Sequence, residues 1–241
     1  PTFEKVYGTR FFNYLSANPE LSEQFNSAMR QGTVVAAQQL LQHYDFGPFR
    51  TIADIPAPVA HAKRRGVAQR FARSCDDDMG RLLAVQAAHL PTGAKVLEIG
   101  AGVGIATAWL VAGLGSRTDV DILSVEADET LSATARSYQW PSYVRIETAN
   151  AETALTDHPS TFDLILADAS AVTGDHLDTM VDASRSRGML IFFPHTGVDA
   201  AADQPEDTPL TRLRKLVLDH DKLVAVDIDR SGGLLIAAKR P

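Results

Sequence analysis

The strongest pattern in the chain is a short apolar run that leads into a glycine-rich turn and then into a longer apolar run. Residues 95–104 read KVLEIGAGVG, and IATAWLVAGL follows. The apolar residues Val96, Leu97 and Ile99 predict a buried strand, and the glycines after them predict a turn that opens a helix. Glycine permits positive φ and lets backbone N–H groups approach a ligand. The stretch therefore predicts a nucleotide cradle at a helix N-terminus.

Downstream, strand patterns alternate with helical ones. The segments DILSVEA, YVRIETA, FDLILADAS and GMLIFF predict four more strands, the last beginning at residue 188. A final helical pattern, TPLTRLRKLVLDH, precedes KLVAVDI and GLLIAAK, which we expect to form an antiparallel hairpin across DRSGG. We predict an α/β, Rossmann-like fold with a seven-stranded, mainly parallel sheet and an antiparallel last strand.

The first part of the chain predicts helices only. Asn18, Pro19 and Glu20 fit a helix start, and a second helix is expected from 33 to about 44. Its aromatic residues exceed what two short helices bury, so we expect an oligomerisation or lid role and a homodimer. Prolines 56 and 58 divide the chain into a helical extension, 1–58, and a cofactor domain, 59–241.

Composition narrows the function classes. The chain has 241 residues, 45% of them hydrophobic, and a net charge of −7, which argues against a nucleic-acid partner. Its most basic spot, KRR at 63–65, is expected to be a solvated helix start. A single cysteine, Cys75, agrees with a reducing compartment. Because no apolar run approaches the ~20 residues of a membrane span and no signal-peptide core is present, we expect a cytoplasmic protein without a membrane partner.

Two acids define the ligand expected at the glycine turn. We place Glu98 inside the loop, where a carboxylate suits an ammonium group better than a pyrophosphate. Ile105 stands where the dinucleotide fingerprint has its third glycine. Glu126 follows Gly100 by about 26 residues, near the spacing of a ribose-binding acid, although it also fits an ordinary strand-end acid. We therefore predict S-adenosyl-L-methionine (SAM) as cofactor and expect Asp128 to cap the next helix.

The N-terminal segment resembles a known family. The runs FEKVYGTRFFNYLSANPELSEQFNSAMRQ and HYDFGPFRTIADI are similar to the segment before the cofactor domain of small-molecule O-methyltransferases of the plant and hydroxyindole type. In that family the glycine loop follows directly, whereas here it arrives only at residue 100. The resemblance implies that linker helices of one methyltransferase family precede a different cofactor domain.

From residue 62 a second resemblance covers the rest of the chain. The run VAQRFARSCDDDMGRLLAVQAAHLPTGAKVLEIGAGVG is similar to a group of bacterial class I SAM-dependent methyltransferases distantly related to catechol-type enzymes. It implies that Ser74, Asp77, Asp78 and Gly80 border the methionine end of the cofactor, unless the three acids simply open a helix. It also places Asn150 beside adenine. The predicted cofactor-binding residues are Ser74, Asp78, Glu98, Gly100, Ala101, Gly102, Gly104, Glu126, Ala127, Asn150, Ala151 and Asp168.

The same resemblance bears on the chemistry. Relatives carry Pro-Gly-Lys after the aspartate of the fourth strand and Asp-Asp after the fifth; this chain has residues 171–173 AVT, then Phe193 and Pro194. Asp168 alone supplies too few oxygen ligands for Mg²⁺, so we expect no metal. Candidate catalytic residues are His195 as general base, His176, and Asp168 as an orienting group.

Three functions remain open. The first is metal-independent O-methylation of a small-molecule hydroxyl, as in secondary metabolism. The second is a SAM-binding scaffold whose catalysis is lost or repurposed. The third is a nicotinamide-dependent oxidoreductase, which Ile105 and Glu98 disfavour.

Overall fold

A computed structural model describes part of the chain in detail. The described residues are 9, 14, 18–24, 55–69, 71, 75–158, 161–193, 209–228 and 233–241. The chain divides into two compact units, Pro1–Asp54 and Ile55–Pro241, four residues before the division expected from the sequence. In the first unit the predicted helix start is confirmed, because residues 19–24 are helical and Ser22 N donates to Asn18 O. The helix expected at 33–44 lies outside the described residues.

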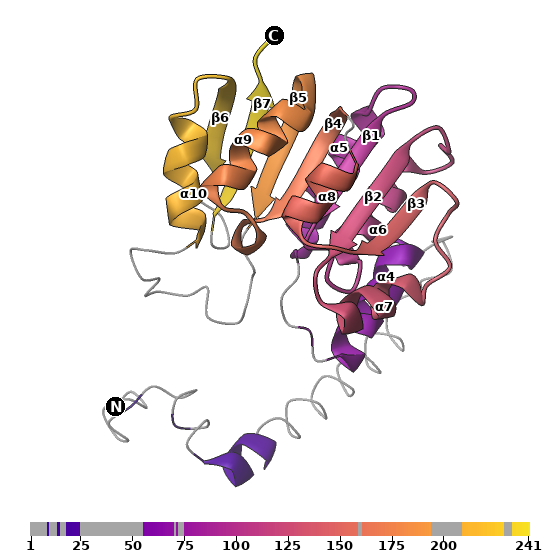
Figure 1. The fold of residues 1–241 in the computed structure, drawn as a ribbon. Coiled ribbons are helices and arrows are strands. Elements are labelled where there is room, and N and C mark those ends of the chain that lie inside the picture. The colour runs from indigo at the N-terminus through magenta and orange to yellow at the C-terminus, as the bar shows by residue number, and fades with distance from the viewer. Residues whose placement is uncertain are drawn as a thin grey trace, which may run out of the picture. The chain divides into compact units, whose positions relative to one another are not determined.

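The second unit is built on one seven-stranded sheet (Figure 1). Its strand order is β3-β2-β1-β4-β5-β7-β6, and β7 runs antiparallel to both of its neighbours. The predicted fold class is therefore confirmed, including the terminal hairpin. The strands are β1 (Lys95–Ile99), β2 (Asp121–Glu126), β3 (Val144–Thr148), β4 (Phe162–Asp168), β5 (Ser184–Phe193), β6 (Leu223–Ile228) and β7 (Leu234–Lys239).

Strand β5 is longer than its pattern predicted. It begins at Ser184 rather than at Gly188, and its register against β4 shifts between Phe162 and Leu164. Arg187 takes a positive φ of 64° inside this irregular stretch. The polar run SRSR hid the first half of the strand because it lacks the apolar alternation by which strands are recognised.

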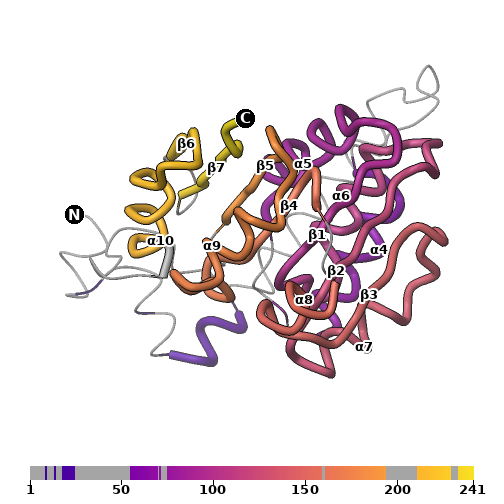
Figure 2. The backbone as a smooth tube through the Cα atoms, turned by 45° about the horizontal axis from the view of Figure 1, so that its top comes forward, coloured from indigo at the N-terminus to yellow at the C-terminus, as the bar shows by residue number. Residues whose placement is uncertain are grey.

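Helices cover both faces of the sheet, as Figure 2 shows. One core lies between the sheet and α4–α7, and the second lies between the sheet and α8–α10. The helices are α4 (Ala57–Ala68), α5 (Asp77–His89), α6 (Ile105–Leu114), α7 (Glu129–Arg136), α8 (Ala151–Asp157), the 3₁₀ turn η1 (Ala169–Ala171), α9 (Gly174–Ala183) and α10 (Pro209–Leu218).

The alternation along β1 explains how this strand joins the two cores. Val96 packs into the core beneath α4–α7, and Leu97 and Ile99 pack into the opposite core. Glu98 shares the face of Val96, because side chains alternate along a strand. Helix α6 is almost wholly buried and packs closely on α5, where a Cβ at Gly113 would lie 2.1 Å from Ala84 O. The loop between β1 and α6 therefore has both ends fixed in the core.

Candidate functional site

The glycine loop and the ends of β2 and β3 meet at the carboxyl edge of the sheet. Gly100 N and Ala101 N both donate to Val125 O of β2, at 2.9 and 3.0 Å. Ala149 N donates to Glu126 O at 3.0 Å, which joins the segment after β3 to the same edge. Ligands of open α/β sheets bind outside the carboxyl ends of the strands. The arrangement makes this edge the candidate binding site.

Each glycine of the turn is required by its conformation and by its neighbours. Gly100, Gly102 and Gly104 have φ of 86°, 55° and 82°. A Cβ at these positions would lie 2.8 Å from the Cβ of Asp168, 2.6 Å from the ring of Phe71 and 2.9 Å from the ring of Trp140, respectively. Any larger residue would both strain the backbone and displace a packed side chain.

The amide groups of the loop are largely satisfied within the protein. Glu126, at the end of β2, accepts Gly102 N on Oε2 at 2.7 Å and Asp128 N on Oε1 at 2.9 Å. Gly104 N donates to Ala101 O at 2.8 Å. With the bonds of Gly100 and Ala101 to β2, four amides of the turn have protein acceptors. The loop therefore presents a shaped surface more than a set of free donors.

The placement of Glu98 inside the loop was wrong. Glu98 belongs to β1 and is fully buried, with Oε2 accepting from Thr107 Oγ1 at 2.5 Å and from Ser124 Oγ at 2.6 Å. Oε1 has no hydrogen-bond partner among the described residues. Burial raises the pKa of this carboxyl, against the opposing effect of the two hydroxyl donors. Thr107 and Ser124 were missed, although each interrupts an apolar run.

Two further polar residues act as helix caps. Asp128 accepts from Leu131 N at 3.0 Å and so caps α7, as expected. Asn150 caps α8 by accepting from Thr153 N on Oδ1 at 2.8 Å. Ala151 is the first residue of α8 and is buried, whereas Ala127 lies exposed between Glu126 and Asp128. Contact of Asn150 and Ala151 with adenine, and of Ala127 with the cofactor, stays a prediction.

Asp168 ends β4 in a buried position. Its side chain is 1% exposed, and Oδ1 accepts from Ser170 N at 2.8 Å, which caps η1. Its Cβ faces Gly100 closely enough to forbid a side chain there. Asp168 therefore links the end of β4 to the glycine loop.

Of the two candidate histidines, only His176 belongs to the described residues. His176 lies in the first turn of α9, and its Nδ1 accepts from Thr173 N at 3.2 Å. In the neutral ring the other nitrogen, Nε2, then carries the proton, so this hydrogen bond leaves no free lone pair for a general base. His195 lies outside the described residues.

The acidic run before α5 fits the helix-start interpretation. Asp76 caps the helix by accepting from Met79 N at 2.8 Å, Asp77 pairs with Lys63, and Asp78 is exposed with Arg81 Nη1 at 3.4 Å. Gly80 packs against Trp109, whose Nε1 would lie 2.1 Å from an added Cβ. Ser74 lies outside the described residues, so no cofactor role of this segment is tested.

The expectation of a solvated helix start at 63–65 was wrong for Arg65. Helix α4 begins at Ala57, and the Arg65 guanidinium donates to Val103 O through Nε at 3.3 Å and Nη2 at 3.1 Å. The guanidinium carbon also lies 4.9 Å from the ring centre of Tyr138 and 5.5 Å from that of Trp140. Burial lowers the pKa of this group, and nearby Tyr138 raises it. Sequence reasoning missed all three residues.

Two features are absent from the described residues, namely a metal-binding cluster and a helix that could cross a membrane. No three side chains of histidine, cysteine, aspartate or glutamate lie close enough together there to bind a metal ion. Within the same residues, no helix combines the length and the apolar character needed to cross a bilayer.

Comparison with known proteins confirms the N-terminal resemblance. A family profile for an O-methyltransferase domain matches residues 1–64. Over 57 residues the chain is 46% identical to the O-demethylpuromycin-O-methyltransferase of Streptomyces alboniger, an alignment that covers 23% of this chain and 15% of that protein. A phenazine O-methyltransferase of Lysobacter antibioticus matches at 44% over 55 residues, 16% of its length. The chain thus aligns with only a small part of these first relatives.

The second resemblance is confirmed by a longer match. Over 195 residues the chain is 29% identical to a protein of Mycolicibacterium vanbaalenii named as an O-methyltransferase, covering 76% of this chain and 84% of that one. Among solved structures, the O-methyltransferase TomG from Streptomyces achromogenes in complex with SAM superposes with a TM-score of 0.62 at 16% identity, over 79% and 92% of the two chains. An O-methyltransferase from Bacillus cereus gives 0.60 at 19%, over 79% and 94%. The fold is that of class I methyltransferases.

Proposed function

We propose that the chain is a SAM-dependent methyltransferase that methylates a hydroxyl group of a small organic molecule without a metal ion. The O-methyltransferases that it resembles at both ends support the reaction class. The solved structure of TomG holds SAM, which supports the cofactor on a shared fold.

One observation in the chain itself carries the choice of cofactor. The N–H of Gly102, which a pyrophosphate would need, donates to Glu126 Oε2 at 2.7 Å, and Gly100 and Ala101 donate to Val125 O. A dinucleotide site uses such amides to bind phosphate oxygens. A loop whose amides are already paired suits a cofactor without phosphates, which favours SAM over a nicotinamide dinucleotide.

The chain's residues then have separate tasks. Glu126 is placed to accept hydrogen bonds from ribose hydroxyls on the lone pairs that its two amide donors leave free, and Asn150 and Ala151 lie at the neighbouring strand end for adenine. SAM supplies an electrophilic methyl group on a sulfonium. The acceptor oxygen forms the new O–CH₃ bond as the CH₃–S bond breaks, with its electron pair returning to sulfur. Positioning of the two reactants supplies much of the rate.

We propose that His195 is the general base that accepts the proton of the acceptor hydroxyl. His176 is disfavoured because its Nδ1 already accepts from Thr173 N. Asp168 is buried and bonded to Ser170 N, which suits an orienting role better than proton transfer. Metal independence is supported by the sequence at the two strand ends, because Asp168 contributes one carboxylate and Phe193 and Pro194 stand where the resembled group carries two aspartates.

Calorimetry and a methyl-transfer assay test this proposal together. We expect SAM and S-adenosylhomocysteine to bind in the micromolar range, no change in NADH fluorescence on titration, and methylation of at least one member of a phenol, catechol and hydroxyquinone panel. EDTA should leave the rate unchanged. Glu126→Gln should weaken SAM binding roughly 10-fold or more, because a charged hydrogen-bond acceptor is lost, whereas Glu129→Gln on the same exposed edge should not.

Other results would lead to different conclusions. No heat of SAM binding would refute the proposal, and NADH binding would favour the oxidoreductase. Tight SAM binding without turnover across the panel would favour a scaffold that has lost catalysis. A rate abolished by EDTA would refute metal independence alone.

The proposal extends to assembly and compartment. We propose a homodimer formed through the N-terminal extension, and light scattering of the full chain would refute it by showing a monomer at micromolar concentration. The presence of a single cysteine, Cys75, supports a reducing compartment such as the cytoplasm.

A further inference from the structure

Arg65 joins three segments that are distant in the sequence. It belongs to α4, its hydrogen-bond acceptor Val103 O belongs to the glycine loop 38 residues away, and the rings beneath it, Tyr138 and Trp140, follow α7. The two rings also pack on each other edge to face, with centroids 4.8 Å apart. A guanidinium that contacts two rings and also donates to Val103 O has little freedom to move away from the loop.

The acceptor of Arg65 is a peptide group that shapes the turn. Val103 O and Gly104 N belong to the same planar peptide and point in opposite directions. Gly104 N donates to Ala101 O at 2.8 Å, which closes the turn, while Val103 O accepts from Arg65 at 3.1 and 3.3 Å. The Val103–Gly104 peptide is thus held on both sides. Gly104, with φ of 82°, would otherwise rotate easily because glycine has no Cβ.

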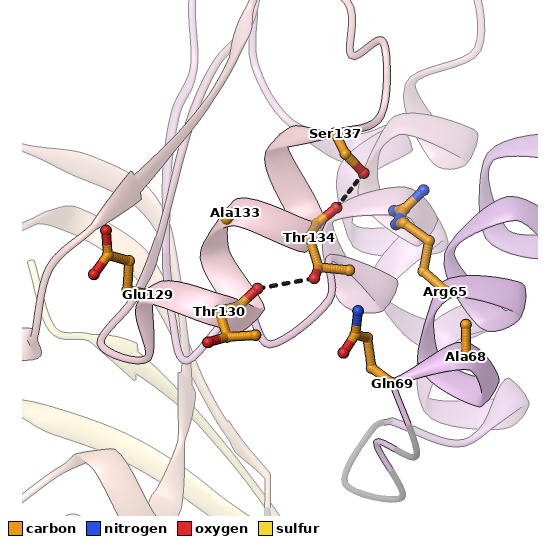
Figure 3. Close-up of a pocket in the computed structure, with 8 residues that line it drawn as sticks. All are labelled: Arg65, Ala68, Gln69, Glu129, Thr130, Ala133, Thr134 and Ser137. Carbon is orange, nitrogen blue, oxygen red and sulfur yellow. Dashed lines mark hydrogen bonds between the residues drawn. The ribbon is translucent and has the colours of Figure 1, made fainter.

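Within the described part of the chain, no side chain other than Arg65 is recorded as a hydrogen-bond partner of Val103 O. Arg65 forms part of the wall of a cavity of about 690 Å³ between α4 and α7, which is also lined by Gln69, Thr134 and Ser137 (Figure 3). Figure 3 shows the hydroxyls of Thr134 and Ser137 bonded within α7 itself, to Thr130 O and Thr134 O. On this side of the loop the guanidinium is therefore the group that reaches Val103 O.

We infer that Arg65 is a positioning residue for the cofactor: its guanidinium fixes the Val103–Gly104 peptide, and thereby the shape of the glycine loop that the cofactor must fit. The inference rests on the proposed function for the identity of the cofactor. The clamp on the loop is a property of the chain with or without SAM.

The test compares Arg65 with its neighbour on the same helix. Arg65→Met keeps an unbranched stem against the rings but removes every donor, and Arg65→Lys keeps the charge but cannot reproduce the planar fork. Arg64→Met makes the same chemical change at an exposed position of α4. Amide hydrogen exchange at Gly104 measures the clamp without cofactor, and calorimetry with SAM measures its consequence.

We expect Arg65→Met to raise both the exchange rate at Gly104 and the Kd for SAM by at least 10-fold. Arg65→Lys should reverse less than half of each increase on a logarithmic scale. Arg64→Met should change both quantities less than 2-fold. The kcat at saturating SAM should stay within about 3-fold, because Arg65 positions the loop and not the acceptor.

Each contrary result has a separate meaning. A folded Arg65→Met protein with unchanged exchange at Gly104 would refute the clamp, whether or not SAM binds. Full recovery by Arg65→Lys would also refute it, because charge alone would then be sufficient. If the wild type binds no SAM while Arg65→Met still accelerates exchange at Gly104, the proposed function fails and the clamp stands.

Discussion

The two halves of the carboxyl edge are built differently. Around the glycine loop, side chains from α4, the end of β2 and the segment after α7 lie against a backbone in which four amides are bonded internally. In the segment after β4, Asp168, Thr173 and His176 form local caps at η1 and at the start of α9. Long-range contacts hold the first half, and local hydrogen bonds hold the second.

This difference suggests how the two halves divide their work. A cofactor shared by many enzymes needs one rigid, complementary surface, which long-range packing supplies. An acceptor site that differs from one enzyme to another is better formed by locally capped segments, since these tolerate changes in sequence. We call the part around the glycine loop and the end of β2 the loop half, and the part after β4 and β5 the acceptor half. We expect substitutions in the loop half to affect SAM binding and stability, and substitutions in the acceptor half to affect turnover.

The largest effect is expected where the two halves touch. Gly100→Ala places a Cβ 2.8 Å from the Cβ of Asp168 at a φ of 86°, so strain and overpacking together should cost about 2–6 kcal/mol of unfolding free energy and abolish measurable SAM binding. Gly93→Ala is the matched control, with φ of 72° and nothing within 4 Å of the new Cβ. Urea unfolding of both variants separates strain from clash. Equal losses would show that the contact with Asp168 is unimportant.

The next prediction tests the acceptor half. His195→Ala should lower kcat by about 10²–10⁴-fold with an unchanged Kd for SAM, because a general base acts on the acceptor and not on the cofactor. His176→Ala should change kcat less than about 3-fold, since its Nδ1 serves Thr173 N. Steady-state kinetics with one methylated acceptor measure both. A large loss in His176→Ala with a normal His195→Ala would reverse the assignment.

The sequence was sufficient for the fold but not for the support of the loop. The short apolar run, the glycine spacing and the longer apolar run predicted β1, the turn and α6, because these signals are local. Arg65 looked like part of a solvated KRR run, since its partners Val103, Tyr138 and Trp140 come from segments that only the fold brings together. Glu98 was assigned to the loop because it stands only two residues before Gly100, the first glycine of the motif. Strand alternation alone, with Val96 and Leu97 on opposite faces, would have placed it in the core.

A smaller effect concerns pH and the buried acid of the loop half. Burial raises the pKa of Glu98 in the folded chain, so its contribution to stability is fully present below the unfolded pKa and is lost as pH rises through the folded pKa. Glu98→Gln imitates the protonated acid. Relative to this variant, the wild type should lose unfolding free energy as pH rises above about 4.3, by at most about 1.4 kcal/mol per pH unit.

Urea unfolding across pH 4–8 (~0.5-unit steps) measures this difference. Glu152→Gln, at an exposed position of α8, is the control and should keep the wild-type pH profile, because removing an exposed charge changes stability little. A wild type that gains stability over Glu98→Gln with rising pH would mean that the hydroxyls of Thr107 and Ser124 outweigh burial. Glu98 would then be a charged part of the loop half at neutral pH.

The smallest effect is expected at Asn150, which belongs to the loop half but is held by a local cap. Asn and Asp cap helices about equally well, so Asn150→Asp should change the unfolding free energy by less than ~0.5 kcal/mol. The Oδ1 of Asn150 accepts from Thr153 N, so only its amide NH₂ donor remains for a ligand. An aspartate at this position would have a second oxygen that could accept from the amino group of adenine. Asn150→Asp should therefore tighten S-adenosylhomocysteine binding about 2- to 10-fold, measured by calorimetry. Weaker binding in the variant would instead indicate that the Asn150 amide donates to a ring nitrogen of the base. The loop half would then recognise adenine through a side chain that also forms a local cap. In that respect it would resemble the acceptor half.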